Sequence, residues 1–218
     1  MAQIFICTIN GGVSSYHATT KTIFSKEENR KGDLLMVQPK NLTQDELYKE
    51  ILEYLEINNI CTIALAYNGI PRAIPVEYRN DGADLYVVSE GRSHQVYQAG
   101  EKGKVVEWKK MFVERNSRCS VGLISPYFGY HSTRGLRMWG RAQIFHKGEA
   151  EWEKGCKLLH VQRQLEDFNQ TEIPDFLIVT RIVPEMMQYF NLAKGIKRAL
   201  WVAPGVDPDE WNCPWEKE

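Results

Sequence analysis

Two arginines and two serines around a pair of expected strands could bind an anion. Arg72 lies near the start of one apolar run, and Ser89, Arg92 and Ser93 come at the end of the next. A guanidinium fork and hydroxyl donors are the groups that best hold a phosphate dianion. The same four side chains also suit the polar surface of a hairpin, so the pattern alone leaves both interpretations open.

Other reactive side chains lack the partners that their chemistry needs. His94 and His131 each adjoin a serine, but neither pair has an evident third member and no G-x-S-x-G motif occurs, which argues against a hydrolase. Cys156 and His160 are spaced for one helix face, yet no second pair completes a tetrahedral zinc site. We therefore expect no metal centre and assign no catalytic side chain.

Charge is balanced over the chain but not along it. The 218 residues carry 27 Lys and Arg against 28 Asp and Glu, which argues against binding to nucleic acid or to a membrane surface. Residues 115–148 nevertheless contain six cations and no acid, which suits a compact anionic ligand. Arg137 and Arg141 would share one face of an expected strand. Salt bridges to the acidic remainder of the chain are the alternative role for these arginines.

The cysteine spacing and the first residues of the sequence indicate the cellular compartment. Five cysteines without a C-x-x-C spacing fit a reducing environment better than a disulfide framework. The short apolar run near the start has no cationic segment before it, so we expect no signal peptide. No apolar run reaches the ~18 residues that a membrane span needs. We expect a cytoplasmic protein.

The periodicity of apolar residues predicts helices separated by strands. Thr43 and Glu46 have the spacing of a capping box, and a helix is expected over 44–58. Strands over 60–67, 70–79 and 84–90 would form an antiparallel meander whose middle strand is an edge strand, or is irregular, where Pro71 and Pro75 lie. The remaining expected elements are a helix over 104–115, strands over 118–125 and 136–146, a long helix over 149–168, and strands over 176–183 and 186–192 separated by Pro184.

This order predicts an α+β fold in which about six antiparallel strands close into a small barrel with flanking helices. Residues 1–40 are expected to form a β-rich extension, residues 41–203 the barrel domain, and residues 204–218 a tail.

Five short motifs, in this order, resemble the pyridoxamine 5'-phosphate oxidase-like, FMN-binding split-barrel family. The similarity covers roughly residues 42–200. It is carried by Ile60-Cys61-Thr62-Ile63-Ala64, Arg72-Ala73-Ile74-Pro75-Val76, Leu85 to Ser93, Asn116 to Val121, and Arg137-Met138-Trp139-Gly140-Arg141-Ala142. The resemblance implies an α+β, predominantly antiparallel six-stranded split β-barrel with flanking helices, and a homodimer that binds FMN at the subunit interface.

The resemblance also implies which residues contact the cofactor. These are Arg72, Ala73, Ile74, Pro75, Val88, Ser89, Arg92, Ser93, Lys109 and Arg137. Where the family has Arg and Lys after the phosphate-site serine, this chain has His94 and Gln95. Arg92, or a lysine at 109 or 110, would then supply the missing charge.

The implied activity is FMN-dependent transfer of hydride or electrons between small molecules, with the chemistry at the flavin. The carboxyl-terminal Arg-Leu-His-Asp-Arg pattern of true pyridoxamine phosphate oxidases is absent, so vitamin B6 oxidation is not expected. Two alternatives stay open. One is a deazaflavin cofactor, and the other is a haem held by His94, His131, His146 or His160.

Overall fold

The computed structural model describes residues 40–91, 94–98, 101–105, 108–126, 129, 132–167 and 169–211. All of them belong to one compact unit, Met36–Glu218. The expected β-rich extension therefore lies outside the described residues. None of the described helices is long and apolar enough to cross a membrane.

The first helix, α1 (Gln44–Glu56), begins as the sequence predicts. The Thr43 side chain accepts a hydrogen bond from the Glu46 amide, and the Glu46 carboxylate accepts one from the Thr43 amide. The apolar face of α1 is buried in the main core, and Gln44 ties its start to β10 through hydrogen bonds to Leu200 and Val202.

Eight strands form one antiparallel sheet. The sheet contains β1 (Ile60–Tyr67), β2 (Ile70–Glu77), β3 (Arg79–Asp81), β4 (Asp84–Glu90), β7 (Arg118–Ile124), β8 (Arg134–Phe145), β9 (Leu177–Asn191) and β10 (Ile196–Val202). Its order is β2-β1-β7-β8-β9-β4-β3, with β10 also paired to β9. A separate hairpin consists of β5 (His94–Gln98) and β6 (Glu101–Val105). The short elements are α2 (Trp108–Arg115), α3 (Ala150–Leu158), α4 (Val161–Glu166), η2 (Leu192–Lys194) and η3 (Pro208–Trp211).

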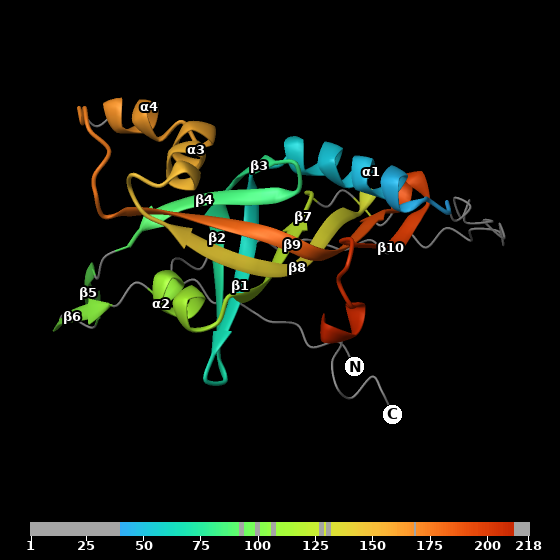
Figure 1. Ribbon diagram of the computed structural model, residues 1–218, viewed down its shortest axis with the longest axis horizontal. Helices are drawn as coiled ribbons and strands as arrows, with labels where there is room; N and C mark the ends of the chain where they lie inside the picture. The colour runs from blue at the N-terminus through green and yellow to red at the C-terminus, as the bar shows by residue number, and fades with distance from the viewer. Residues whose placement is uncertain are drawn as a thin grey trace, which may run out of the picture. The chain divides into compact units, whose positions relative to one another are not determined.

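Different helices pack against the two faces of this sheet. Figure 1 labels these helices and the strands. The inner face holds the main core, to which α1 contributes Ile51 and Tyr54 and α2 contributes Phe112. The outer face is covered by α3 and α4 at β4 and β9, where Trp152 and Val179 form a second core. Over β1, β7 and β8 no described α-helix covers the outer face, and of the described elements only the short η3 contacts it, at Arg118 and Arg141. We call this uncovered surface the open face.

The split-barrel class predicted from the sequence is confirmed, but the predicted strand count of six is too low. The predicted meander is correct only in part: both hairpins form, as β1–β2 and β3–β4, but β2 and β4 are not hydrogen-bonded neighbours in the sheet. The strand expected over 70–79 is interrupted at Tyr78, whose ring is fully buried and whose hydroxyl donates to the Leu55 carbonyl oxygen. β3 and β4 lie at the opposite end of the sheet order from β2.

The long helix expected over 149–168 is two helices. His160 adopts a left-handed backbone with φ of 52° between α3 and α4. Residues two apart on a continuous helix point about 200° apart, so Leu159 and Val161 could not both face one core. The break at His160 lets both pack in the second core. The helix expected over 104–115 likewise begins later, at Trp108.

Pro184 does not separate two strands, as the sequence suggested, because β9 runs through it. The pairing shifts there: Trp139 faces Met186 while Gly140 faces Pro184, which leaves Glu185 as the extra residue of a bulge. Proline is tolerated in a sheet at such bulges. The strand β10 was not predicted, and it places Trp201 against Tyr48 of α1 with ring centroids 5.1 Å apart.

Candidate functional site

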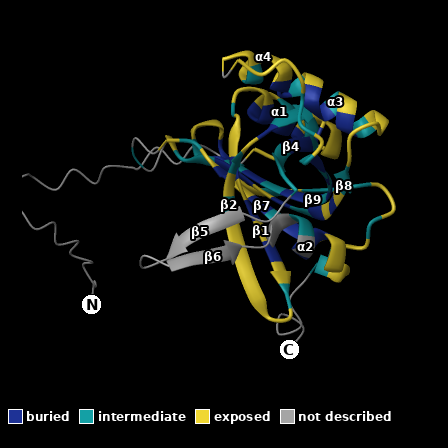
Figure 2. Ribbon diagram, turned by 90° about the vertical axis from the view of Figure 1, so that its left-hand side faces the viewer, coloured by how far each residue is buried: buried dark blue, intermediate teal, exposed yellow. Residues whose placement is uncertain are grey.

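The strand β2 lies at an edge of the sheet, and the backbone groups that point away from β1 are exposed. Between Pro71 and Pro75, these groups include one N–H donor. Tyr78 donates its amide to the Asn59 carbonyl oxygen at 2.8 Å, which fixes the alternation of the β1 and β2 pairing. By that alternation, residues 71, 73 and 75 point their backbone groups away from β1. Pro71 and Pro75 have no N–H. Within this stretch Ala73 alone therefore offers an amide donor at the free edge, which Figure 2 shows as an exposed strand.

Side chains alternate along the same strand. Arg72 and Ile74 lie opposite Leu65 and Ile63 and so belong to the inner face, whereas Ala73 and Pro75 belong to the open face. Ile74 packs against the main core. Arg72 remains exposed at the edge of the sheet, as an anion-binding group needs to be.

A pocket of about 270 Å³ joins the end of β2 to the end of β4. Val88 and Ser89 line it together with Glu77, and its apolar wall comes from α4 and the start of β9. The Ser89 hydroxyl oxygen is buried and has no hydrogen-bond partner among the described residues. A buried polar group without a partner is costly, so such an atom calls for a ligand or for another explanation.

The structure brings only part of the expected cofactor set together. Val88 and Ser89 share a pocket with the end of the strand that carries Arg72, Ala73, Ile74 and Pro75. Arg92 and Ser93 lie outside the described residues, and of Lys109 only the backbone, in α2, is described. The carboxylates of Glu77 and Glu90 line the pocket without a described cation among its lining residues. A phosphate there would need a charge from elsewhere.

Arg137 lies elsewhere in the sheet. It is on β8, and β1 and β7 separate it from β2. Three inter-strand steps amount to about 14 Å. Within one chain, therefore, Arg137 lies apart from the edge of β2, and its predicted contact with the cofactor requires a second copy of the chain.

Arg137 instead lines a pocket of about 470 Å³ on the outer face of β8, β9 and β10. We call it the cationic pocket, and its lining residues are Arg137, Gln188, Phe190, Leu192, Lys197 and Arg198. Three of the six are cations and none is an acid. Sequence reasoning missed the two cations of β10, because that strand was not recognised and its bulge cannot be read from the residue pattern.

The backbone of β10 is irregular where it reaches the cationic pocket. The pairing with β9 shifts between Ile196 and Ala199, so Lys197 and Arg198 lie in a bulge. Arg198 has φ of 49°, in the left-handed region that side chains other than glycine, asparagine and aspartate rarely adopt.

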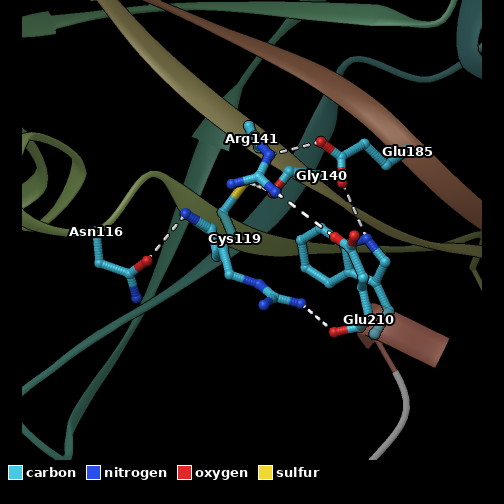
Figure 3. A network of polar contacts seen from close by, with 8 residues as sticks. Asn116, Cys119, Gly140, Arg141, Glu185 and Glu210 are labelled. Atoms are coloured by element: carbon cyan, nitrogen blue, oxygen red, sulfur yellow. Dashed lines mark hydrogen bonds and ion pairs between the residues drawn. The ribbon is translucent and has the colours of Figure 1, made fainter. Parts of the chain in front are cut away.

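Most other cations of the acid-free stretch have structural partners. Arg141 forms an ion pair with Glu185 at 2.6 Å, and Trp211 donates its indole N–H to the other oxygen of the same carboxylate at 3.0 Å (Figure 3). The Arg118 guanidinium stacks over the Trp211 ring at 4.2 Å and donates to the Glu210 carbonyl oxygen. This network fastens η3 to the outer face. The salt-bridge alternative is thus the observed role of Arg141.

Arg134 is also structural. Its Nε donates to the Tyr189 hydroxyl at 2.7 Å, and its guanidinium lies 4.6 Å from the Tyr54 ring centroid. Arg134 thereby connects α1 and β9 to the start of β8. Lys147 pairs with Asp175 at 2.6 Å.

No cluster of three potential metal ligands occurs among the residues that the structure describes. The described candidate haem ligands His146 and His160 are exposed on a loop and at the start of α4. The side chains of His94 and His131 lie outside the described part. Burial raises the pKa of the Cys119 thiol to about 12 and that of Cys156 to about 11. Neither is a thiolate at neutral pH, so neither is an activated nucleophile.

Comparison with known proteins supports the fold. The chain matches no protein-family profile and no curated protein sequence. Among solved structures it is similar to a candidate pyridoxamine 5'-phosphate oxidase from Listeria innocua. That alignment has 23% identity and a TM-score of 0.50, and it covers 67% of this chain and 99% of that one. The chain therefore has a pyridoxamine 5'-phosphate oxidase-like split-barrel fold.

Two further structures are more distant. An FAD-binding protein from Mesorhizobium loti aligns at 18% identity with a TM-score of 0.47, covering 64% of this chain and 90% of that one. A haem storage protein from Vibrio cholerae aligns at 12% identity with a TM-score of 0.45, covering 71% and 92%. The fold assignment rests on the first comparison.

Proposed function

We propose that the protein binds FMN at the edge of β2 and the end of β4, and that it is a flavin-dependent oxidoreductase. The observation that carries this proposal is the Ser89 hydroxyl, which is buried without a partner among the described residues on the strand whose end lines this pocket. A phosphate or ribityl oxygen of the cofactor would supply the missing partner. The bound flavin supplies the hydride or electron transfer.

The residues of this chain would hold and orient the cofactor. The Ala73 amide is the donor available to the ring edge, and Arg72 is the exposed cation on the same strand. Arg92, Ser93 and Lys109 remain predicted contributors to phosphate binding. No side chain is required as a general acid or base, because the flavin itself carries the hydride or electron transfer.

A homodimer belongs to the same proposal. The open face exposes Ile60 and Ile124, which line a groove of about 370 Å³ together with Thr62 and Gly122. A second copy of the chain would cover these side chains. A flavin at the β2 edge would then be close to the subunit interface, with a small molecule as donor or acceptor of electrons.

Substitution of Ser89 gives two effects of opposite sign. Ser89→Ala removes an unpartnered buried hydroxyl, so the cofactor-free protein should become more stable by about 1 kcal/mol. The same variant should bind FMN several-fold more weakly, because the cofactor loses its hydrogen-bond partner. Urea unfolding measures the first effect, and quenching of flavin fluorescence measures the second.

Thr180 is the matched control. Its hydroxyl oxygen is also buried without a described partner, but it lies on β9 and does not line the pocket. Thr180→Val should stabilise the protein and leave FMN affinity unchanged. Equal FMN affinity in wild type and Ser89→Ala would show that Ser89 does not bind the cofactor.

The donor at the edge of β2 can be tested separately. Ala73→Pro removes the remaining outward N–H without touching the bonds to β1, and should weaken FMN binding up to about tenfold. Pro75→Ala adds an outward N–H and should not weaken it. Parallel titrations with a deazaflavin and with haem identify the cofactor. A Soret shift on haem addition, with no quenching of FMN, would replace the flavin proposal by the haem alternative.

A further inference from the structure

We propose that residues 203–211 form a latch that must leave the open face before a second copy of the chain can dock there. We call this segment the strap. It runs from the end of β10 through η3 to Trp211. This regulation rests on the proposed homodimer and adds a control to it: the closed strap opposes dimerisation, and its release permits it.

The strap is held by polar contacts to outward side chains of the sheet. Trp211 donates its indole N–H to Glu185 at 3.0 Å, and its ring lies 4.2 Å from the Arg118 guanidinium. Arg118 also donates to the Glu210 carbonyl oxygen, and Arg141 lies 3.9 Å from the Glu210 carboxylate (Figure 3). No residue of η3 is buried. Exposed ion pairs and cation–π contacts are individually weak, so the closed strap is only modestly preferred over an open one.

The start of the strap has the structure of a hinge. Ala203 is bonded to the sheet, because its amide donates to the Glu185 carbonyl oxygen at 2.9 Å. Gly205 follows with a φ of 81°, and the Val206 amide closes the turn on the Ala203 carbonyl oxygen at 3.1 Å. Among the described residues, none between this turn and η3 forms a backbone hydrogen bond to the sheet. Rotation at the turn would therefore lift η3 without breaking a strand pairing.

The strap and a second copy need the same space. A stable interface buries about 800 Å² on each partner. Three neighbouring strands of roughly seven residues span about 14 Å by 24 Å, or about 340 Å² of flat surface, so a dimer through β1, β7 and β8 needs the whole open face. Arg118 and Ile124 mark the two ends of β7 and point to this face. Facing sheets pack about 10 Å apart, which leaves no room for η3 and its tryptophan between them.

Because each copy carries a strap, the dimer depends on two release steps. If the strap is closed roughly ten times more often than it is open, about one chain in ten can dock, and the apparent dissociation constant rises about a hundredfold. Salt screens the exposed contacts that hold the strap. Dimerisation should therefore strengthen as the salt concentration rises, whereas a dimer held by ion pairs would weaken.

Trp211→Ala is the main test, because it removes both contacts of the indole and leaves the sheet face unchanged. We expect faster amide exchange over residues 204–211, an unchanged melting temperature, and a dimer dissociation constant that is lower by about tenfold or more in light scattering. Trp211→Phe keeps a ring over Arg118 but loses the bond to Glu185, so its dissociation constant should lie between the other two. A weaker dimer in Trp211→Ala would overturn the latch, because the strap would then belong to the interface.

The salt dependence separates release of the strap from a general effect of charge. Between about 50 mM and 500 mM NaCl the wild-type dimer should strengthen, and Trp211→Ala, whose strap is already open, should lose most of this dependence. Lys147→Ala is the matched control, because it removes an exposed ion pair, with Asp175 at 2.6 Å, that does not touch the strap. Lys147→Ala should keep the wild-type dissociation constant and salt dependence. The same change in this control as in Trp211→Ala would overturn the latch.

Failure of the latch and failure of the proposed homodimer give different results. A dimer of equal affinity in wild type and Trp211→Ala overturns the latch and keeps the homodimer. No dimer in either chain removes both. A dimer that forms in Trp211→Ala at concentrations where the wild type is monomeric supports both, and Ser89→Ala still tests flavin binding within one chain.

Discussion

Arg137 and Arg141 are the same residue type and lie on the same face of β8, but their contacts differ. Arg137 has no partner among the described side chains, whereas Arg141 is bonded to Glu185 and lies 3.9 Å from the Glu210 carboxylate. Sequence patterns predicted the shared face correctly. They could not separate the two roles, because Glu185 reaches Arg141 only through the bulge at Pro184.

This contrast gives a prediction for Arg141→Ala. The ion pair is partly exposed, so its loss should lower the free energy of unfolding by about 1 kcal/mol or less. Amide exchange in residues 208–211 should increase, because η3 loses its contact with β8. Arg137→Ala should leave both the unfolding and this exchange unchanged; a stability loss in Arg137→Ala would contradict these roles.

A second prediction at the residue scale concerns alkaline pH. The pKa of Cys119 is about 12 in the folded protein because burial disfavours the thiolate, against about 8.5 for an unfolded thiol. Burial also raises the pKa of Tyr78. Each group favours the folded state fully below its unfolded pKa, and this contribution is lost as pH rises towards the folded value. Stability should therefore fall from about pH 9 upward, by about 1.4 kcal/mol per pH unit for Cys119.

Urea unfolding between pH 7 and 11 measures this decline. Cys119→Ala should reduce the slope between about pH 9 and the onset of tyrosine ionisation, while Cys156, whose pKa burial raises to about 11, keeps contributing. The stability of the variant at pH 7 will be lower because it leaves a cavity. An unchanged slope in the variant would exclude Cys119 as the titrating group.

At the scale of elements, glycines show where the sheet has no room for a side chain. A β-carbon at Gly140 would lie 2.2 Å from the Val183 carbonyl oxygen, within the bulge of β9. A β-carbon at Gly122, on the neighbouring strand β7, would meet nothing within 4 Å. The bulge thus depends on Gly140, and β9 can continue through Pro184 because of it.

Gly140→Ala should therefore destabilise the protein by several times the effect of Gly122→Ala. Overpacking against backbone typically costs 1–3 kcal/mol or more, while Gly122→Ala should be neutral or slightly stabilising because alanine suits a strand better than glycine. Thermal unfolding of the two variants measures this difference. Equal melting temperatures would mean that β8 and β9 can shift apart at no cost.

Elements that depend on local signals were predictable, and those that depend on tertiary packing were not. The capping box at Thr43 and the turn at Asn68-Gly69 are encoded within a few residues, and both were correctly located. The break at His160 and the bulge at Pro184 arise because distant side chains must reach one core or one pairing partner. No local pattern contains that information. The β2 edge was predicted because proline excludes a central position.

At the scale of the whole molecule, the open face carries the last prediction. Ile60 and Ile124 are 58% and 70% exposed, side by side at the groove between β1 and β7. In a symmetric dimer each copy would bury both residues, so one substitution acts twice. Burying an isoleucine contributes roughly 1.5–3 kcal/mol, and Ile124→Asp should therefore weaken a dimer through this face by 100-fold or more.

Light scattering of the eluting protein across a concentration series measures this change. Ile70→Asp is the matched control, because Ile70 is also exposed, at 49%, but its side chain belongs to the opposite face of the sheet. The control should remain dimeric. If the flavin lies near the interface, Ile124→Asp should also weaken FMN binding, although it touches no proposed cofactor residue. A chain that stays monomeric at tens of micromolar, both as wild type and as Trp211→Ala, would remove the dimer, while the Ser89 experiments would still test the flavin site within one chain.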